Sequence, residues 1–265
     1  MISFIGIGNM GGSMIRRLAS SRDRSSEIGL FDVNAAAADT LSKELGVTKF
    51  ESSGELVKRS DIIILAVKPN VVRSVLTGIK EAFFSDDRIL ITIAAGLPIS
   101  FYKDILGDSA KVIRTMPNMP AQVGEGMTLL SSDGLVNENE MAEAKAVFDN
   151  FGRTEIVDES MMNSVIALTS SSPAYVFMFI EAMADAAVQS GIPRKLAYEM
   201  AAQAVYGSAK LVLETGRHPA ELKDAVCSPA GTTIEAVAKL EEKGFRDAVI
   251  SAMKACTDKA NGMKG

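Results

Sequence analysis

The sequence predicts an α/β protein in which an N-terminal, doubly wound sheet is followed by an all-helical C-terminal domain. Up to residue 158, short β-branched runs alternate with helical patterns, which is typical of a parallel sheet with crossover helices. Beyond residue 158 the strand pattern stops and long amphipathic helical patterns take over. Because the 265 residues can fill two cores, we expect two domains, residues 1–158 and 159–265.

The individual elements follow from this alternation. In the first domain, strands are expected at residues 2–7, 28–31, 48–50, 62–67, 88–94, 111–116, 126–131 and 154–157, and helices at 12–20, 35–45, 71–84, 99–106 and 138–151. In the second domain, helices are expected at residues 161–190, 194–214, 219–226, 231–242 and 245–261. Glycine and proline near residues 191–193 and 216–219 separate these helices.

The opening segment carries the most informative motif. The apolar residues 2–5 lead directly into Gly6, Gly8 and Gly11, at the G-x-G-x-x-G spacing of a Rossmann-type dinucleotide site. Gly6 permits a tight turn, Gly8 lets the backbone approach a pyrophosphate, and Gly11 lets the following helix lie close to the strand. Asp32 ends the second strand, about twenty residues further on, as the motif requires. The alternative is a strand, turn and helix without a cofactor.

Ligands of a parallel sheet bind at the carboxyl ends of its strands, so the residues after each expected strand are the candidate cofactor contacts. They are Gly6, Ile7, Gly8, Asn9, Met10 and Gly11, then Asp32 and Asn34, then Ser53, then Ala66, Val67, Lys68 and Pro69, and finally Ala94, Ala95 and Gly96. Lys68 is expected near the cofactor's phosphates or ribose, and the small residues from Ala94 to Gly96 near the nicotinamide. Pro69 fits an ordinary helix start equally well.

Polar islands interrupt the second half of the chain, at residues 169–175 and 227–233. Hydroxyl clusters among apolar helices cost free energy unless a partner needs them. In the second island, the N–H groups of the following helix suit a substrate carboxylate, whereas Ser228 and Thr232 can equally act as ordinary N-caps.

His218 is expected to start a helix and not to act as a base. The double-proline segment 116–120 either walls the reaction pocket or is an extended linker.

Composition excludes several classes of protein. The net charge of −5 and the pI of about 5.1 argue against nucleic acid and anionic membranes as partners. With only two cysteines, Cys227 and Cys256, we expect no disulfide framework, and this low cysteine content suits a reducing cytosol. The sequence contains no histidine cluster and no CxxC motif, so we expect no metal site. The N-terminus lacks the basic segment of a signal peptide, so we expect a cytoplasmic protein. The apolar residues 174–188 include Glu181 and Asp185, so a buried helix is expected there instead of a membrane span.

Two helical segments indicate a homodimer. Residues 181–188 and 198–205 are rich in alanine and methionine and present small side chains on more than one face. Such helices need neighbours on several sides, which the helices of a second subunit would provide. Burial within a single domain is the alternative.

Taken together, these motifs resemble the pyrroline-5-carboxylate reductase family, nearly from end to end. The resemblance lies in residues 4–11, 66–69, 94–96, 114–118, 172–187 and 218–236, of which the last segment is the most specific. It implies reduction of 1-pyrroline-5-carboxylate to L-proline with NADPH or NADH, the last step of proline biosynthesis. It also implies an intertwined homodimer, sometimes assembled further into larger rings.

The resemblance also assigns roles to residues of the substrate site. Thr233 is the catalytic residue that hydrogen-bonds the ring nitrogen, Ser228, Gly231 and Thr232 hold the carboxylate, and Ser171 and Asn118 complete the substrate contacts. A protonated imine accepts hydride readily, so the site needs orientation and charge stabilisation and no strong general acid.

Some positions depart from the family's pattern. Ser170 and Ala230 stand where the family has glycine, and Met119 stands where it has threonine. An added Cβ at Ala230 matters if this residue needs a positive φ.

Asp32 should bind an adenosine ribose and repel a 2′-phosphate, which favours NADH and predicts that Asp32→Ser shifts the preference towards NADPH.

Two other functions share features of this sequence. A β-hydroxyacid dehydrogenase would share this architecture, but those enzymes resemble one another in a lysine on the long interdomain helix, and residues 161–188 contain none. A non-catalytic dinucleotide sensor would not need Thr233 and the island at residues 172–175.

Overall fold

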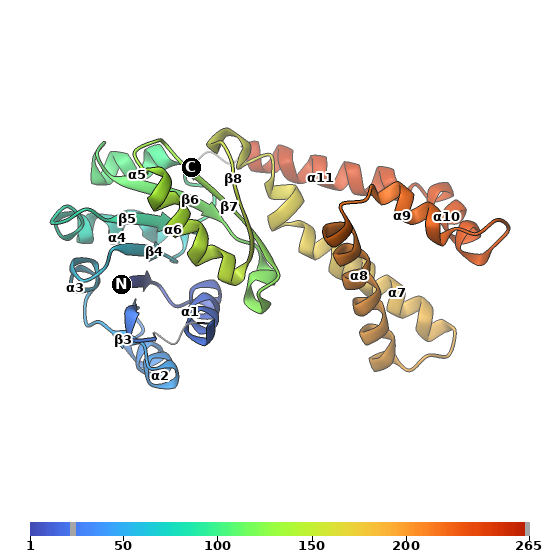
Figure 1. Cartoon of the computed structure of the whole chain (residues 1–265), viewed down its shortest axis with the longest axis horizontal. Helices are drawn as coiled ribbons and strands as arrows, with labels where there is room; N and C mark the ends of the chain where they lie inside the picture. The colour runs from blue at the N-terminus through green and yellow to red at the C-terminus, as the bar shows by residue number, and fades with distance from the viewer. Residues whose placement is uncertain (22–24, 263–265) are drawn as a thin grey trace. The chain divides into compact units, whose positions relative to one another are not determined.

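The computed structural model describes residues 1–21 and 25–262 (Figure 1). Its contacts divide the chain into two compact units: residues 1–170 with the chain end from Thr257, and residues 171–256. The domain boundary between residues 158 and 159 therefore stays a proposal. Residues 263–265 of the expected helical domain lie outside the described residues.

Within the described residues, the first unit contains an eight-stranded sheet of order β3-β2-β1-β4-β5-β6-β7-β8. The strands are β1 (Ile2–Ile5), β2 (Ile28–Phe31), β3 (Thr48–Lys49), β4 (Ile62–Leu65), β5 (Ile89–Thr92), β6 (Lys111–Met116), β7 (Gly126–Ser132) and β8 (Gly152–Ile156). The strand order reverses beside β1, which pairs in parallel with both β2 and β4. Such a reversal is the switch point at which doubly wound sheets bind ligands. The predicted fold class is confirmed.

One strand pair differs from the expected parallel sheet. β7 runs antiparallel to β6, with Thr115 opposite Leu130, whereas the other neighbouring strands are parallel. The connection between them holds only a 3₁₀ helix at Met119–Val123. A parallel return needs a crossover of about a dozen residues or more, usually a helix, and the sequence provides none here. The expectation of parallel strands was wrong for this pair.

Among the described residues, six α-helices of the first unit lie between these strands. They are α1 (Asn9–Ser21), α2 (Ala35–Leu45), α3 (Ser53–Lys58), α4 (Pro69–Phe83), α5 (Ile99–Leu106) and α6 (Glu138–Phe148). α3 was not expected from the sequence. Its start is fixed by Ser52, whose hydroxyl accepts a hydrogen bond from the Glu55 N–H at 3.2 Å. A helix this short shows too little apolar periodicity to be detected from the pattern alone.

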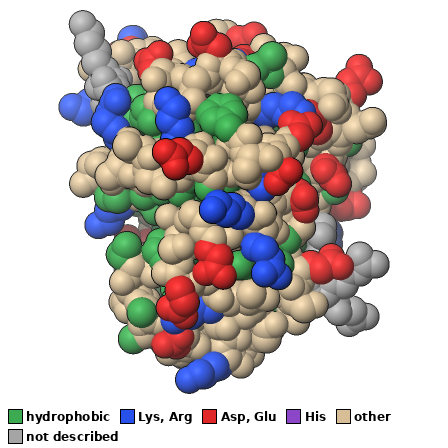
Figure 2. Space-filling view, turned by 90° about the vertical axis from the view of Figure 1, so that its left-hand side faces the viewer, with side chains coloured by type: hydrophobic (Ala, Val, Ile, Leu, Met, Phe, Trp, Pro, Cys, Tyr) green, Lys and Arg blue, Asp and Glu red, His purple; other side chains and the backbone are tan. Residues whose placement is uncertain are grey.

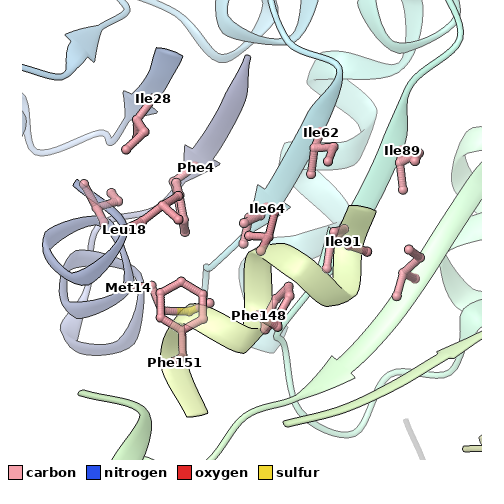
Figure 3. Packing of buried hydrophobic residues seen from close by; sticks show 14 of the residues in the cluster. Phe4, Met14, Leu18, Ile28, Ile62, Ile64, Ile89, Ile91, Phe148 and Phe151 are labelled. Carbon is pink, nitrogen blue, oxygen red and sulfur yellow. The ribbon is translucent and has the colours of Figure 1, made fainter. Parts of the chain in front are cut away.

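The core lies on both faces of the sheet because successive strand residues point in opposite directions. Phe4 and Ile64 face α1, α2 and α6, where they pack with Met14, Leu18 and Phe148 (Figure 3). On the other face, alternate residues of the same strands pack with apolar side chains of α3, α4 and α5. This double layer holds the carboxyl ends of the strands rigidly in place.

Outside this core, the surface of the molecule carries charges of both signs. Figure 2 shows lysine and arginine side chains interspersed with aspartate and glutamate over the face in view. Their fields partly cancel over that face.

The second unit is helical in the described residues. It contains α7 (Ser172–Gln189), α8 (Arg194–Thr215), α9 (Pro219–Val226), α10 (Thr232–Glu242) and most of α11 (Phe245–Gly262). α7 and α8 pack against each other. His218 is the N-cap of α9, and its Nδ1 accepts a hydrogen bond from the Ala220 N–H at 3.2 Å, so its expected role at a helix start is confirmed.

The expectation of a buried helix at residues 174–188 is wrong for a single chain. Met178 is 68% exposed and Phe177 53% exposed, and Ala184 is the buried residue of α7. Residues Ile166–Gln189 are long and apolar enough to be a candidate membrane span by length and composition, which for one helix is weak evidence. Within the described residues, much of the apolar surface of α7 is therefore left exposed, although α7 packs against α8.

Candidate functional site

The sheet's switch point forms a cavity at the carboxyl ends of β1, β4 and β5. This cavity has a volume of about 520 Å³. It is lined by Gly8, Asn9, Met10, Ala66, Val67, Lys68, Pro69, Ile93, Ala94 and Ala95. All of these but Ile93 are candidate cofactor contacts in the sequence analysis. Ile93 lay inside the strand expected at residues 88–94, but β5 ends at Thr92, which leaves Ile93 at the cavity.

Each glycine of the motif has its own geometry. Gly6 has φ of +99°, and a Cβ there would overlap the carbonyl of Ala66 on the neighbouring strand's loop. A Cβ at Gly11 would overlap the Gly6 carbonyl, so α1 lies against the turn only because both residues are glycine. Gly8 is exposed and a Cβ there would meet nothing within 4 Å. The backbone at Gly8 is therefore open to a ligand at the start of α1.

Asp32 connects the glycine turn to the end of β2. Its Oδ2 accepts a hydrogen bond from the Ile7 N–H, and its Oδ1 accepts one from the Asn34 N–H, both at 2.8 Å. The Asn34 side chain in turn accepts from the Ala37 N–H at 3.1 Å and caps α2. The carboxylate thus holds two loops of the site, and each oxygen keeps a lone pair for a ribose hydroxyl. Ser53 is the first residue of α3, after β3.

A second cavity, of about 450 Å³, adjoins the first at Gly8 and Asn9. Its other lining residues are Ile7, Gly12, Ser13, Arg16, Ala37, Thr40 and Leu41. It lies between the glycine turn and α2. Of the predicted cofactor residues, ten line one of these two cavities, whereas six line neither: Gly6, Gly11, Asp32, Asn34, Ser53 and Gly96. Gly96, with φ of +82°, lies in the turn after Ala95.

Asn118 fixes the double-proline segment within the first unit. Its Nδ2 donates to the Thr169 carbonyl at 3.0 Å, and its Oδ1 accepts from the Met127 N–H at 2.9 Å. The half-buried amide retains one N–H and one lone pair for a ligand. Asn118 therefore has a positioning role in this structure beside the substrate contact expected for it.

A π-helical turn at Ile166–Ser170 precedes the serine island, and the sequence analysis did not foresee it. Such turns are rare and occur frequently at functional sites. Among the described residues, the shielded Ser170 hydroxyl has no hydrogen-bond partner. Ser171, the N-cap of α7, accepts a hydrogen bond from the Cys256 thiol at 3.3 Å.

The second island forms a tight turn followed by a helix start. The Gly231 N–H donates to the Ser228 carbonyl at 3.0 Å, and Ala230 has φ of +55°. With Pro229 fixing a negative φ, this is the pattern of a type II turn, which normally has glycine where Ala230 stands. A Cβ at Gly231 would overlap the Ser228 hydroxyl, so any side chain there would require that hydroxyl to move.

α10 begins directly after this turn. Its N-cap is Gly231, and within the described residues no side chain caps the helix, so the alternative in which Ser228 or Thr232 acts as the N-cap is not realised. The N–H groups of its first turn, which includes Thr232 and Thr233, remain available to an anion. The structure assigns the candidate substrate residues Ser171, Ser228, Gly231, Thr232 and Thr233 to the second unit and Asn118 to the first.

Comparison with families of known proteins gives two matches. Residues 159–263 match the family described as pyrroline-5-carboxylate reductase dimerisation, and residues 1–96 match NADP oxidoreductase, coenzyme F420-dependent. The chain is 47% identical to pyrroline-5-carboxylate reductase of Escherichia coli, over 98% of this chain and 96% of that protein. It is 37% identical to the Arabidopsis thaliana enzyme of the same name, over 98% and 94% of the two chains.

Solved structures give the same similarity. A pyrroline-5-carboxylate reductase from Coxiella burnetii superposes with a TM-score of 0.94 at 28% identity, covering 100% of this chain and 98% of that one. The pyrroline carboxylate reductase of Plasmodium falciparum, solved with NADP bound, gives a TM-score of 0.87 at 29% identity, with the same coverage.

Proposed function

The chain belongs to the pyrroline-5-carboxylate reductase family, and from that premise we propose that the cavity beside Gly8 holds its nicotinamide cofactor and that Ser228 to Thr233 hold its substrate. The reaction is the NAD(P)H-dependent reduction of 1-pyrroline-5-carboxylate to L-proline, the last step of proline biosynthesis. The observation that carries the proposed cofactor site is the open backbone at Gly8, where α1 begins at the switch point of the sheet.

The residues at this edge fit a dinucleotide. Gly8, Asn9 and Met10 would hold the pyrophosphate through the N–H groups and the positive end of α1. Lys68, exposed at the N-cap of α4, would bind phosphate or ribose, and Ala94 would border the nicotinamide end. When bound, the reduced nicotinamide supplies the hydride.

The second island would hold the imine. The uncapped N–H groups after Gly231 suit the substrate carboxylate, and Ser228 adds a hydroxyl at the same turn. Thr233 would hydrogen-bond the protonated ring nitrogen and orient the C=N bond towards the cofactor. Since an iminium accepts hydride readily, these residues need only orient the substrate and stabilise its charge.

The helical part of the chain is a dimerisation domain of this family, and we propose a homodimer as the functional unit. The exposed apolar side chains of α7, α8 and α11 support this assignment, since a second subunit would remove them from water. Further assembly into larger rings remains part of the proposal. Both cysteines are free thiols, which supports a cytosolic enzyme.

Steady-state kinetics of the Thr233→Val variant test this function. We expect kcat/KM for 1-pyrroline-5-carboxylate to fall by about 10- to 100-fold, the value of one lost hydrogen bond to a charged group, with KM for NAD(P)H unchanged. Thr77→Val removes an exposed hydroxyl on α4 and is the matched control. Unchanged kcat/KM in Thr233→Val would contradict the assigned role, and absence of turnover by the native chain would contradict the function itself.

A further inference from the structure

We propose that Tyr102 is a positioning residue of the reduction, acting through Thr92 on the backbone of Ala94 at the nicotinamide end of the cavity. The inference rests on the proposed function, because it needs the cofactor to lie along this edge. It concerns a side chain that touches neither substrate nor cofactor and that the sequence analysis did not single out.

The three residues form a buried chain of hydrogen bonds. Tyr102 on α5 and Thr92 at the end of β5 are both 0% exposed, and their hydroxyl oxygens lie 2.6 Å apart. The Thr92 Oγ1 accepts a hydrogen bond from the Ala94 N–H at 3.2 Å. From the neighbouring strand, the Thr115 hydroxyl donates to the Thr92 carbonyl at 3.0 Å. The last residue of β5 is therefore held from several directions.

The Ala94 N–H belongs to the turn that borders the cavity. Ala94 and Ala95 line the cavity, and Gly96, with φ of +82°, completes the turn. The Thr92 hydroxyl has one proton and two lone pairs, of which the Ala94 N–H uses one. The Tyr102 phenol is the other buried partner of the Thr92 hydroxyl and therefore fixes the direction in which that hydroxyl points. The position of the turn at Ala94 depends on this direction.

The phenol is suited to this role because it keeps its proton. Burial raises the pKa of Tyr102 to about 12, although the Thr92 hydrogen bond and the charge of Arg114 lower it in part. The hydroxyl therefore stays neutral at physiological pH. A shift of the turn by about 1 Å would alter the approach of hydride to substrate, and misplacements of this size can cost about 100-fold in rate.

The test separates positioning from simple packing. Tyr102→Phe keeps the ring, and the proposal expects the Kd of NADH and NADPH, measured by the fluorescence of the bound cofactor, to rise by about fivefold or more, and kcat to fall. KM for 1-pyrroline-5-carboxylate should stay within about twofold, because the proposed substrate contacts are other residues, Ser228 to Thr233. Tyr206→Phe, which removes an exposed phenol hydroxyl, should change neither Kd.

A double variant makes the test sharper. Combining Tyr102→Phe with Thr92→Val replaces both hydroxyls by apolar groups, so no buried hydroxyl is left unpaired. The Kd should nevertheless stay raised, because the Ala94 N–H has lost its acceptor. Thr92→Ser, which keeps the hydroxyl, should bind cofactor like the native chain.

The outcomes are distinguishable. An unchanged Kd in Tyr102→Phe, or a Kd that recovers in the double variant, overturns the positioning role and leaves the proposed function intact. A native chain that binds neither NADH nor NADPH contradicts the proposed function itself.

Discussion

Asp32 serves two purposes at a single carboxylate. Its oxygens hold the N–H groups of Ile7 and Asn34, and they also face the position at which a Rossmann-type sheet binds the adenosine ribose. A 2′-phosphate would be repelled there. The residue therefore braces the glycine turn, and we propose that it also selects the cofactor.

The cofactor preference follows from this charge. We expect the native chain to have a lower KM for NADH than for NADPH, and Asp32→Ser to shift the preference towards NADPH. Because serine replaces two hydrogen-bond acceptors by one, the midpoint of thermal unfolding should also fall. Asp32→Asn is the control that keeps the size and removes the charge. Steady-state kinetics in which the native chain already strongly favours NADPH would refute this role.

Ala230 shows how a departure from a family's pattern gains meaning from structure. The sequence analysis singled it out only on the condition of a positive φ, and the structure gives φ of +55°. The sequence alone shows that position 230 is alanine where the family has glycine. The backbone angle could not be predicted from it, because it depends on the turn closed between Ser228 and Gly231.

Replacing Ala230 by glycine should stabilise the protein. A left-handed conformation costs a non-glycine residue about 1–2 kcal/mol, partly offset by the greater freedom of glycine in the unfolded chain. We expect Ala230→Gly to raise the free energy of unfolding by about 1 kcal/mol in denaturant titrations at fixed protein concentration. Ala238→Gly, at an exposed helical position of α10, should lower it by a similar amount. Loss of stability in Ala230→Gly would show that the alanine is not strained.

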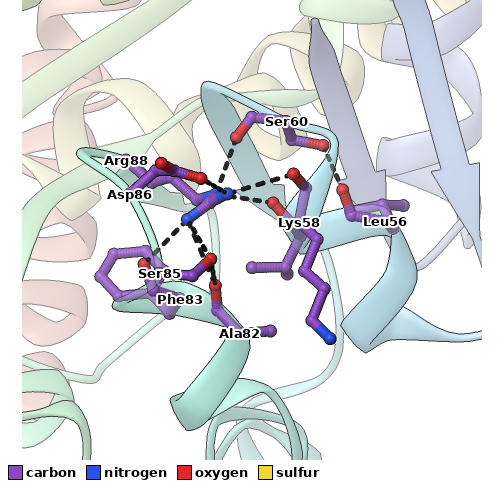
Figure 4. Close-up of polar contacts among 9 residues, drawn as sticks. Leu56, Lys58, Ser60, Ala82, Phe83, Ser85, Asp86 and Arg88 are labelled. Atoms are coloured by element: carbon purple, nitrogen blue, oxygen red, sulfur yellow. Dashed lines mark hydrogen bonds and ion pairs between the residues drawn. The ribbon is translucent and has the colours of Figure 1, made fainter.

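At the scale of elements, Arg88 joins the ends of two helices to the sheet. Arg88 is 4% exposed, and its guanidinium donates to the carbonyls of Val57 and Ser60, at and just after the end of α3, and to the Ala82 carbonyl near the end of α4 (Figure 4). It also pairs with Asp86 at 2.7 Å. Helix ends leave carbonyls without partners, and one side chain here satisfies several of them.

Loss of this guanidinium should be costly. We expect Arg88→Met to lower the free energy of unfolding by about 3–5 kcal/mol, since it leaves several buried carbonyls without donors. Lys80→Met, at an exposed position of α4, should change it by about 0.5 kcal/mol or less. Chemical denaturation measures both, and a loss below about 1 kcal/mol in Arg88→Met would show that water can replace the side chain.

The elements also show where prediction from sequence works. The strands at residues 28–31 and 111–116 and the helices at 35–45, 99–106 and 219–226 were predicted with the observed bounds, because their apolar periodicity is strong and their ends are marked. The direction of β7, the short α3 and the role of Arg88 were missed. Each depends on which segments meet in space, and periodicity along the chain does not contain that information.

At the scale of the whole molecule, the two units differ in how they bury their apolar side chains. The first unit packs both faces of its sheet within one chain. The second leaves large apolar residues exposed on every long helix, Met178, Leu213 and Ile250 among them. Alanine-rich and methionine-rich segments predicted this need for a partner, whereas the individual contact residues could not be predicted, since they depend on the packing of two chains.

Charge placed on this surface should therefore separate the subunits. We expect the native protein to have a mass in solution of at least twice its 28.1 kDa chain, and Met178→Glu with Ile250→Asp to shift it towards the monomer. Two buried charges without partners would cost several kcal/mol in a dimer interface. Light scattering after size-exclusion chromatography measures the masses. Leu135→Asp, at an exposed apolar residue of the first unit, should keep the native mass. A native protein that runs as a monomer would contradict the dimer and would leave the exposed apolar helices without an explanation.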